Sequence, residues 1–245
     1  MTSQNSQNIH SPTGFLNINK PAPARTAGKL KNGVTKMKLK DAKKITGSLT
    51  VTSKMPCPSY SLPTHACITG KVLAESLPDS ICGKCYANRG FYALYKKTIL
   101  PAQDYRLQAI DDQRWVESMI SQIDNLLYFR WHDSGDLQSV DHLRKIVAVC
   151  EGTPYTQHWI PTRERGIVRK YLKSGGNIPV NLTLRLSAVM FDQKSETFAN
   201  LPTSTSHKKA APIGFDCLAS SQSGACLNCR ACWDKSVTNV SYKAH

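Results

Sequence analysis

Four cysteines near the end of the chain have the spacing of metal ligands. They follow the pattern C-x8-C-x2-C-x2-C-W, which places the thiols at Cys217, Cys226, Cys229 and Cys232. Two-residue gaps put successive cysteine side chains on the same side of a tight turn, as in metal-binding knuckles and iron–sulfur loops. Buried or disulfide-bonded cysteines are the alternative, but scattered core thiols are rarely spaced so regularly. The pattern therefore predicts a metal site.

The three closely spaced thiols favour iron–sulfur over zinc. Structural zinc usually takes two C-x2-C pairs, or one such pair and a histidine pair, whereas C-x2-C-x2-C is the core of bacterial ferredoxin loops. The ferredoxin continuation C-x3-C-P is absent, because Trp233, Asp234 and Lys235 follow Cys232. A fourth ligand must come from Cys217 or elsewhere, or one iron stays open. We predict an iron–sulfur cluster, [4Fe-4S], with Zn as the alternative.

A second group of cysteines lies in a loop-rich insertion nearer the N-terminus. Its members are Cys57, Cys67 and the pair in Cys82-Gly-Lys-Cys85. Cys57 and Cys67 are too far along the chain for local geometry to place them, so the signal is weaker than that of the first group. The loop setting nevertheless favours metal ligands over core packing.

Polar residues follow two of the expected strands. The first strand runs into R-W-H-D-S-G-D at residues 130–136, and the second into P-T-R-E-R at 161–165. Ligands of parallel α/β folds bind at the C-terminal ends of strands, so we predict His132 and Asp133 as catalytic residues. Ser134 and Asp136 are equally well explained as caps of the next helix. No hydrolase elbow, phosphate-binding loop or dinucleotide-binding motif is found.

The segments that position these residues alternate between strand and helix. Strands are expected at 48–53, 126–132, 155–160 and 180–186. Helices are expected over 91–125, divided at Pro101, and over 140–150 and 165–173. Cys150 shares the apolar face of its helix and is predicted to be a core residue. Helices between successive strands imply parallel crossovers, so we predict an α/β fold. It would be a partial (β/α) barrel or an open parallel sheet, with loop-rich cysteine-bearing N- and C-terminal segments.

The last of these strands predicts a polar face of the sheet. Leu182, Leu184 and Leu186 alternate with polar residues, whereas a parallel sheet covered on both faces is apolar throughout. The polar face is either open to water or lines a cavity that accepts an anion. We favour the cavity, with substrate-binding residues Arg130, Arg163 and Arg185.

The chain is strongly basic, with a net charge of +15. Residues 1–56 hold ten Lys and Arg and one acid, Asp41, and so contribute +9 (10 − 1). We interpret residues 1–47 as a basic, partly disordered arm, which either binds nucleic acid or acts as a solubilising tail. Residues 48–245 are interpreted as a single α/β metal-binding domain. Neither a membrane span nor a secretory signal is expected, and nine cysteines without such a signal indicate a reducing compartment.

Several short motifs resemble a family of bacteriophage proteins related to mycobacteriophage gene product eighty-eight. They extend from about residue 48 to His245 and include C-x-T-G at 67–70, C-x-x-C-Y-A at 82–87, R-W-H-D-S-G-D at 130–136, W-x-P-T-R-E at 159–164 and C-x-x-C-R-A-C-W at 226–233. The resemblance implies a phage-encoded protein in the host cytoplasm with a cysteine-bound cluster, but no particular reaction. It assigns one group to Cys67, Cys82 and Cys85 and the other to Cys217, Cys226, Cys229 and Cys232, and it does not require Cys57.

The C-x-x-C-Y motif also resembles radical S-adenosylmethionine enzymes, which use three cysteines on a partial (β/α) barrel. The fourteen residues between Cys67 and Cys82 depart from their compact C-x3-C-x2-C pattern, which argues against binding of that cofactor. Three functions follow from the sequence. The first is a redox or radical-type enzyme with an unknown substrate. The second is a zinc-stabilised nucleic-acid-binding protein that uses the basic arm. The third is a virion or host-interaction protein whose cluster is structural.

Overall fold

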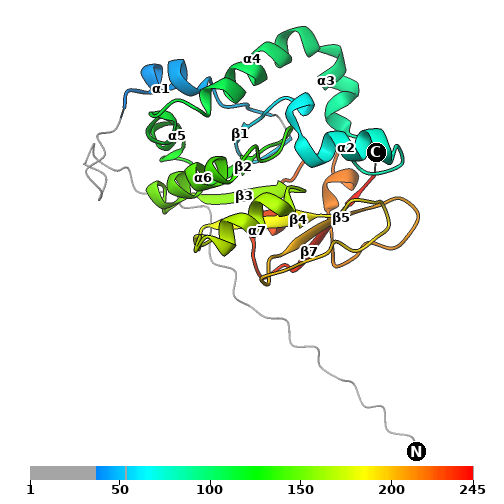
Figure 1. Cartoon of the computed structure of the whole chain (residues 1–245). Helices are drawn as coiled ribbons and strands as arrows, with labels where there is room; N and C mark the ends of the chain where they lie inside the picture. Colours follow the sequence, from blue (N-terminus) through cyan, green and yellow to red (C-terminus); the bar gives the residue numbers. More distant parts are fainter. Residues whose placement is uncertain (1–36, 53, 245) are drawn as a thin grey trace, which may run out of the picture.

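The chain forms an open sheet of seven parallel strands flanked by helices (Figure 1). The computed structural model describes residues 37–52 and 54–244. The strands are β1 (Ser59–Tyr60), β2 (Tyr128–Trp131), β3 (Gln157–Thr162), β4 (Leu182–Ser187), β5 (Thr203–His207), β6 (Phe215–Asp216) and β7 (Asn239–Lys243). They lie in the order β1-β2-β3-β4-β5-β7-β6. The predicted α/β class is confirmed, in its open-sheet form.

The helices cover one face and the upper edge of this sheet (Figure 1). They are α1 (Leu39–Thr46), α2 (Ile68–Ser76), α3 (Gly90–Leu94), α4 (Lys96–Ala109), α5 (Trp115–Ile123), α6 (Val140–Gly152) and α7 (Arg165–Lys173). The bounds of α7 are those expected from the sequence, and α6 is two residues longer than expected. Among the described residues, no helix has the length and apolar character needed to cross a membrane.

Three local expectations differ from the structure. Pro101 lies inside α4, and the break between helices falls earlier, at Tyr95. A proline in the second turn of a helix removes one hydrogen bond without ending the helix. The strand expected at 48–53 is reduced to a single antiparallel bridge between Thr50 and Ser59.

The folded part of the chain begins within the segment we interpreted as an arm. Leu39–Thr46 forms α1, in which Ala42 and Thr46 are buried. The amide of Met37 donates to the hydroxyl of Ser121 at 3.1 Å, and the side chain of Gln122 donates to that of Thr46 at 2.6 Å. These contacts hold α1 on α5. Residues 1–36, which make up most of the arm, lie outside the described residues.

The helix side of the sheet carries the main apolar core. Phe129 and Trp131 of β2, Ile160 of β3 and the leucines of β4 are buried there against α5, α6 and α7. Cys150 is fully buried in the same core, which confirms its assignment as a core residue. Removal of this apolar surface from water is the main stabilising contribution to such a fold.

The opposite side of the sheet is covered by the C-terminal segment. The register aligns Ser59, Arg130, Trp159 and Thr183 in one row across β1, β2, β3 and β4. Trp159 packs against Trp233, with ring centroids 5.2 Å apart. The alternation in β4 therefore reflects an apolar layer on the helix side and the cysteine-bearing C-terminal segment on the other.

Candidate functional site

The predicted cysteine ligands gather into two sets in different parts of the fold. The strand-end set, in the segment around α2, comprises Cys67, Cys82 and Cys85. The C-terminal set, between β6 and β7, comprises Cys217, Cys226, Cys229 and Cys232. Within each set the thiols affect one another. Burial raises the pKa of Cys67, and Asp136 and the other two thiols of its set add to the shift. Burial likewise raises the pKa of Cys217, and two thiols of its own set add to it.

The strand-end set is fastened to the C-terminal ends of β3 and β4. Cys67 directly precedes α2, and the carboxylate of Glu164, just after β3, accepts hydrogen bonds from the amide and the hydroxyl of Thr69, each at 2.7 Å. The amide of Ile81 donates to the carbonyl of Val189, beyond β4, at 3.0 Å. Because ligands of parallel α/β folds bind at this edge, the set occupies the place where such folds carry out chemistry.

Gly70 leaves a space that two sulfurs of the strand-end set share. A Cβ atom at Gly70 would lie 3.5 Å from Sγ of Cys82, 3.7 Å from Sγ of Cys67 and 3.1 Å from Cβ of Cys67. Both sulfurs therefore face a small volume that any other side chain at residue 70 would fill. Thiols around a shared space are a donor set that fits a bound metal cluster.

Asp133 positions the segment that follows Cys85. Its Oδ2 accepts a hydrogen bond from the hydroxyl of Tyr92 at 2.6 Å, and its backbone carbonyl accepts one from the hydroxyl of Tyr86. Arg130 donates from Nη2 to the Tyr86 hydroxyl at 3.3 Å. Asp133, predicted to be catalytic, thus lies below the loop of the strand-end set and helps to hold it.

Asp136 and Arg163 lie beside the strand-end set. Asp136 accepts hydrogen bonds from the Thr162 hydroxyl at 2.6 Å and from the amides of Arg163 and Leu137. Burial raises the pKa of Asp136 to about 6, and these hydrogen bonds oppose the shift. Burial also raises the pKa of Cys82, and the guanidinium of Arg163 opposes that change. Asp136 is therefore structural, and Arg163 is the predicted substrate-binding arginine that adjoins these thiols.

Arg185 holds the C-terminal set against the sheet. Its side chain is fully buried and donates five hydrogen bonds of 2.7–3.2 Å to the backbone carbonyls of Thr203, Ala231, Cys232, Asp234 and Val237. The hydroxyl of Thr183, on the same face of β4, donates to the carbonyl of Trp233 at 2.7 Å. Arg185 therefore does not line a cavity for an anion, as we had predicted, because the carbonyls of the cysteine turn occupy all of its face.

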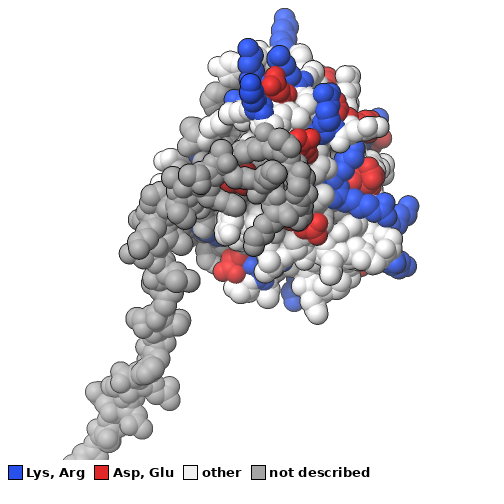
Figure 2. Space-filling view, turned by 90° about the vertical axis from the view of Figure 1, so that its left-hand side faces the viewer, with Lys and Arg blue, Asp and Glu red and all other residues white. Residues whose placement is uncertain are grey.

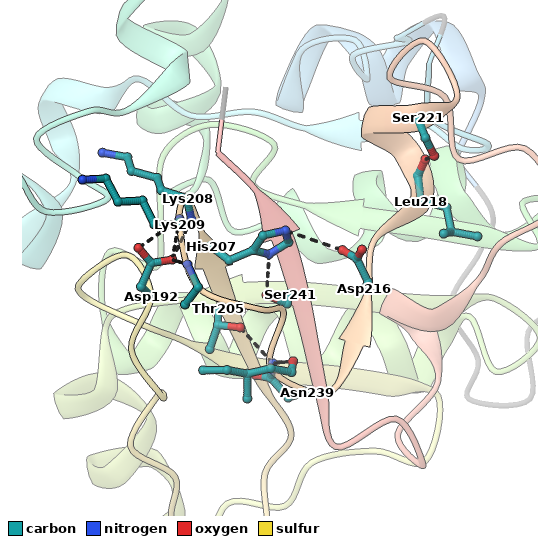
Figure 3. Close-up of polar contacts among 12 residues, drawn as sticks. Asp192, Thr205, His207, Lys208, Lys209, Asp216, Leu218, Ser221, Asn239 and Ser241 are labelled. Atoms are coloured by element: carbon teal, nitrogen blue, oxygen red, sulfur yellow. Dashed lines mark hydrogen bonds and ion pairs between the residues drawn. The ribbon is translucent and has the colours of Figure 1, made fainter.

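Cys217 is positioned by the strands at the edge of the sheet (Figure 3). Its amide donates to the carbonyl of Ser241 at 2.9 Å. The hydroxyl of Ser241 lies 2.9 Å from Nδ1 of His207, and Nε2 of His207 lies 3.8 Å from Oδ1 of Asp216. The order resembles a hydrolytic triad, but Ser241 is 0% exposed and cannot meet a substrate. These contacts instead join β5, β6 and β7 and fix the start of the cysteine segment.

Two arginines beside the C-terminal set have unpaired nitrogen atoms. Cζ of Arg130 lies 4.6 Å from the ring centroid of Trp159, and Cζ of Arg230 lies 5.1 Å from that of Tyr128. The Nε atom of each arginine is buried and, among the described residues, has no hydrogen-bond partner. Buried polar atoms normally have a partner, and an anionic thiolate cluster would supply one.

His132 does not reach either set of cysteines. Its φ of +56° lies in the left-handed region, which breaks the alternation of β2 and turns the side chain toward α6. The ring lies 5.4 Å from that of His142 and 6.4 Å from that of Trp131, between centroids. His132 is only 3% exposed, and neither ring nitrogen has a partner among the described residues. The predicted catalytic histidine is thus placed in the helix-side core.

The polar cavity that we predicted at the strand ends is not formed by the residues assigned to it. Arg185 is covered by the cysteine turn and His132 lies on the helix side, while Arg130 and Asp133 lie near the cysteines. A hollow does occur at the opposite ends of β2, β3 and β4, where these strands begin. It is lined by Tyr128, Gln157, Val180, Arg230, Trp233, Asp234 and Lys235.

Three buried histidines make the fold sensitive to acid. Burial lowers the pKa of His142 and of His158 to about 3, and that of His132 well below its ordinary value. The unfolded chain binds protons at these side chains near pH 6.5, whereas the folded chain does not. The stability they contribute is therefore complete above pH 6.5 and is lost as the pH falls toward 3.

We expect His142→Gln to weaken this acid sensitivity. Between pH 6 and pH 4, the free energy of unfolding of the variant should fall less steeply than that of the unchanged protein, by about 1.4 kcal/mol per pH unit. Urea unfolding at several pH values measures the slopes. His65→Gln, at an imidazole whose side chain is 59% exposed, is the control and should leave the slope unchanged. Equal slopes for His142→Gln and the unchanged protein would contradict the burial of a neutral imidazole.

The structure brings one further cysteine to the C-terminal set. Cys57 is 7% exposed and packs with Trp159 and Trp233, and Cys232 lies against the same cluster. Sequence reasoning left Cys57 aside because it is far from these residues in the chain. The only signal was its residue type, since β1 and β3 bring the segments together.

Among the described residues, no three His, Cys, Asp or Glu side chains converge as the ligands of a single metal ion would. Ligands of one zinc ion lie about 2.3 Å from it, whereas in an iron–sulfur cluster each cysteine binds its own iron. The features that fit a bound cluster are the shared space at Gly70 and the unpaired Nε atoms of Arg130 and Arg230.

Comparison with known proteins gave one match. A family model described as gene product 88 matches residues 24–235, which include both sets of cysteines and β1 to β6. No curated protein and no solved structure matches the chain.

Proposed function

The chain belongs to the gene product 88 family, and we propose that it is an iron–sulfur protein with redox or radical-type chemistry at the strand-end set. Membership of the family confirms the resemblance to phage gene products that the sequence motifs indicated. The iron–sulfur clusters, the reaction and a location in the host cytoplasm are parts of the proposal.

The observation that carries the proposal is the gathering of distant cysteines around places prepared for an anionic group. Cys67 and Cys82 share the space over Gly70. Near the C-terminal set, Arg130 and Arg230 each have a buried Nε atom for which the described residues supply no partner. Thiolates bring several negative charges together, so a metal and nearby cations must compensate for them.

The two sets suit different tasks. Three thiols can hold a four-iron cluster and leave one iron without a cysteine, so the strand-end set is the proposed reaction site. When bound, a cluster would supply one-electron transfer and an iron that can take a ligand. Glu164 orients α2 and Cys67, and Arg163 provides a positive charge beside Cys82 that suits an anionic substrate. The C-terminal set, closed by Arg185, suits electron transfer or structural support.

Single cysteine variants test the proposal because they separate the two sets. We expect Cys82→Ser to lose the iron and acid-labile sulfide of the strand-end set, and Cys229→Ser to lose those of the C-terminal set. The double variant should lose both. Iron, sulfide and zinc per chain are measured on protein purified without oxygen. Cys150→Ala removes a buried core thiol and should keep the full metal content.

Two outcomes would contradict the proposal. Iron that Cys82→Ser and Cys229→Ser both retain would show that these thiols hold no cluster. Zinc in place of iron and sulfide would exclude redox chemistry and leave the structural and nucleic-acid functions.

Nucleic-acid binding is the second candidate, and one surface favours it. Lys38, Lys40, Lys43 and Lys44 are all exposed on or just before α1. Figure 2 shows basic side chains standing out along the upper part and one side of this face of the molecule, with acidic side chains between them. Phosphate contacts made by lysines give affinity without sequence preference, and such affinity falls steeply with salt.

A further inference from the structure

We infer that Cys57, and not Cys217, is the fourth ligand of the cluster held by Cys226, Cys229 and Cys232. The inference rests on the proposed function, since it concerns which thiols hold the second cluster. It assigns a metal-binding role to a cysteine outside both spacing patterns of the sequence.

Backbone contacts bring the segment of Cys57 to the cysteine turn. The amide of Cys226 donates to the carbonyl of Lys54 at 3.0 Å. A Cβ atom at Gly224 would lie 2.9 Å from Cδ of the Lys54 side chain, so the two segments are pressed together. On the other side, the amide of Arg130 donates to the carbonyl of Pro58 at 3.2 Å. Cys57 is therefore held between the cysteine turn and β2.

The side chain of Cys57 lies on the inner side of the C-terminal set. It is buried with Trp159 and Trp233, and Cys232 packs against the same cluster. The electrostatic neighbours of its thiol are the thiols of Cys226 and Cys232 and the guanidinium groups of Arg130 and Arg230. A buried thiol between two other thiols and two arginines with unpaired Nε atoms is surrounded as a cluster ligand is.

Arg130 separates Cys57 from Cys217. It interacts with the thiols of Cys57, Cys226 and Cys232, which therefore share one cation. The surroundings of Cys217 include the carboxylate of Asp216, which disfavours a further negative charge. Cys217 is also more exposed than Cys57. The shared cation and the deeper burial place Cys57 among the ligands and Cys217 outside them.

Alanine variants at the two positions distinguish these thiols. We expect Cys57→Ala to lose the same share of iron and sulfide as Cys229→Ser, and to lose the visible absorption and the reduced-state electron paramagnetic resonance signal of that cluster. Cys217→Ala should keep both the metal content and the signal. Cys150→Ala is the matched control, because it removes another buried thiol and should change neither.

The share of iron held by the strand-end set shows whether Cys57→Ala still folds, since that share should remain. Cys57→Ser, which keeps the volume of the side chain, is the second variant if the alanine variant is insoluble, and the same loss is expected. Full retention of metal by the Cys57 variants, or loss of the C-terminal share in Cys217→Ala, would overturn the inference. Absence of iron and sulfide from the unchanged protein would instead refute the proposed function itself.

Discussion

Arg185→Met is expected to destabilise the protein by on the order of 4 kcal/mol, since it leaves several buried carbonyl groups without donors. The guanidinium of Arg185 is the donor for five backbone carbonyls, three of which belong to residues 231–234. Methionine fills a similar volume but donates no hydrogen bond. Each carbonyl that loses its donor in a buried place costs about 1–3 kcal/mol, and partial entry of water lowers the sum.

The effect of Arg185→Met should be strongest in the C-terminal segment. Because the cysteine turn would lose its attachment to β4, the variant should also lose the iron of the C-terminal set while keeping that of the strand-end set. Arg185→Lys keeps the charge but has only three donor hydrogens on one nitrogen, so an intermediate loss is expected.

Urea unfolding gives the stability change, and iron analysis gives the local effect. Arg144→Met is the control, because Arg144 is exposed on α6 and makes a single side-chain hydrogen bond, to Ser174. A loss below about 1 kcal/mol for Arg185→Met would contradict the assignment, since that is the value expected for a surface position.

Gly135→Ala is expected to cost roughly 2–5 kcal/mol, the sum of backbone strain and overpacking. The φ of Gly135 is +77°, and a Cβ atom there would lie 2.5 Å from Cβ of Leu62 and 2.9 Å from its carbonyl oxygen. Leu62 cannot move away easily, because its amide donates to the carbonyl of Ser134 at 2.9 Å and its carbonyl accepts from the Ser134 hydroxyl at 2.7 Å. The loop after β2 and the segment after β1 would have to separate.

Gly175→Ala isolates the backbone part of this cost. Gly175 has a φ of +82°, but no atom lies within 4 Å of the position of its Cβ. Its replacement should therefore cost only about 1–2 kcal/mol of strain. Thermal or urea unfolding of both variants measures the difference. Equal losses at the two glycines would show that the contact with Leu62 does not limit residue 135.

The parts of the fold that depend on local patterns could be predicted from the sequence. The apolar stripe of α7 and the glycines after it defined that helix, and the alternation in β4 was visible in its leucines. By contrast, β5 has the sequence T-S-T-S-H and contains no apolar residue. It is a strand because β4 and β7 pair with it on either side, and pairing between distant segments leaves no local signal.

The candidate site shows the same division between local and distant causes. Regular spacing identified seven cysteines, and the structure gathers them into two sets. The role of Arg185 could not be predicted, because its five partners are brought to it only by the folded chain. Nor could the orientation of His132, since a positive φ at a residue other than glycine depends on the surrounding structure. Both arginine and histidine had been assigned to a cavity from alternation alone.

The most direct test of the iron–sulfur proposal is the iron, sulfide and zinc content of the unchanged protein, purified without oxygen and examined by visible spectroscopy. We predict brown protein in which iron and sulfide are present in matched amounts and zinc is absent. Colourless protein with stoichiometric zinc and no sulfide would contradict the proposal and would leave the cysteine sets as structural supports.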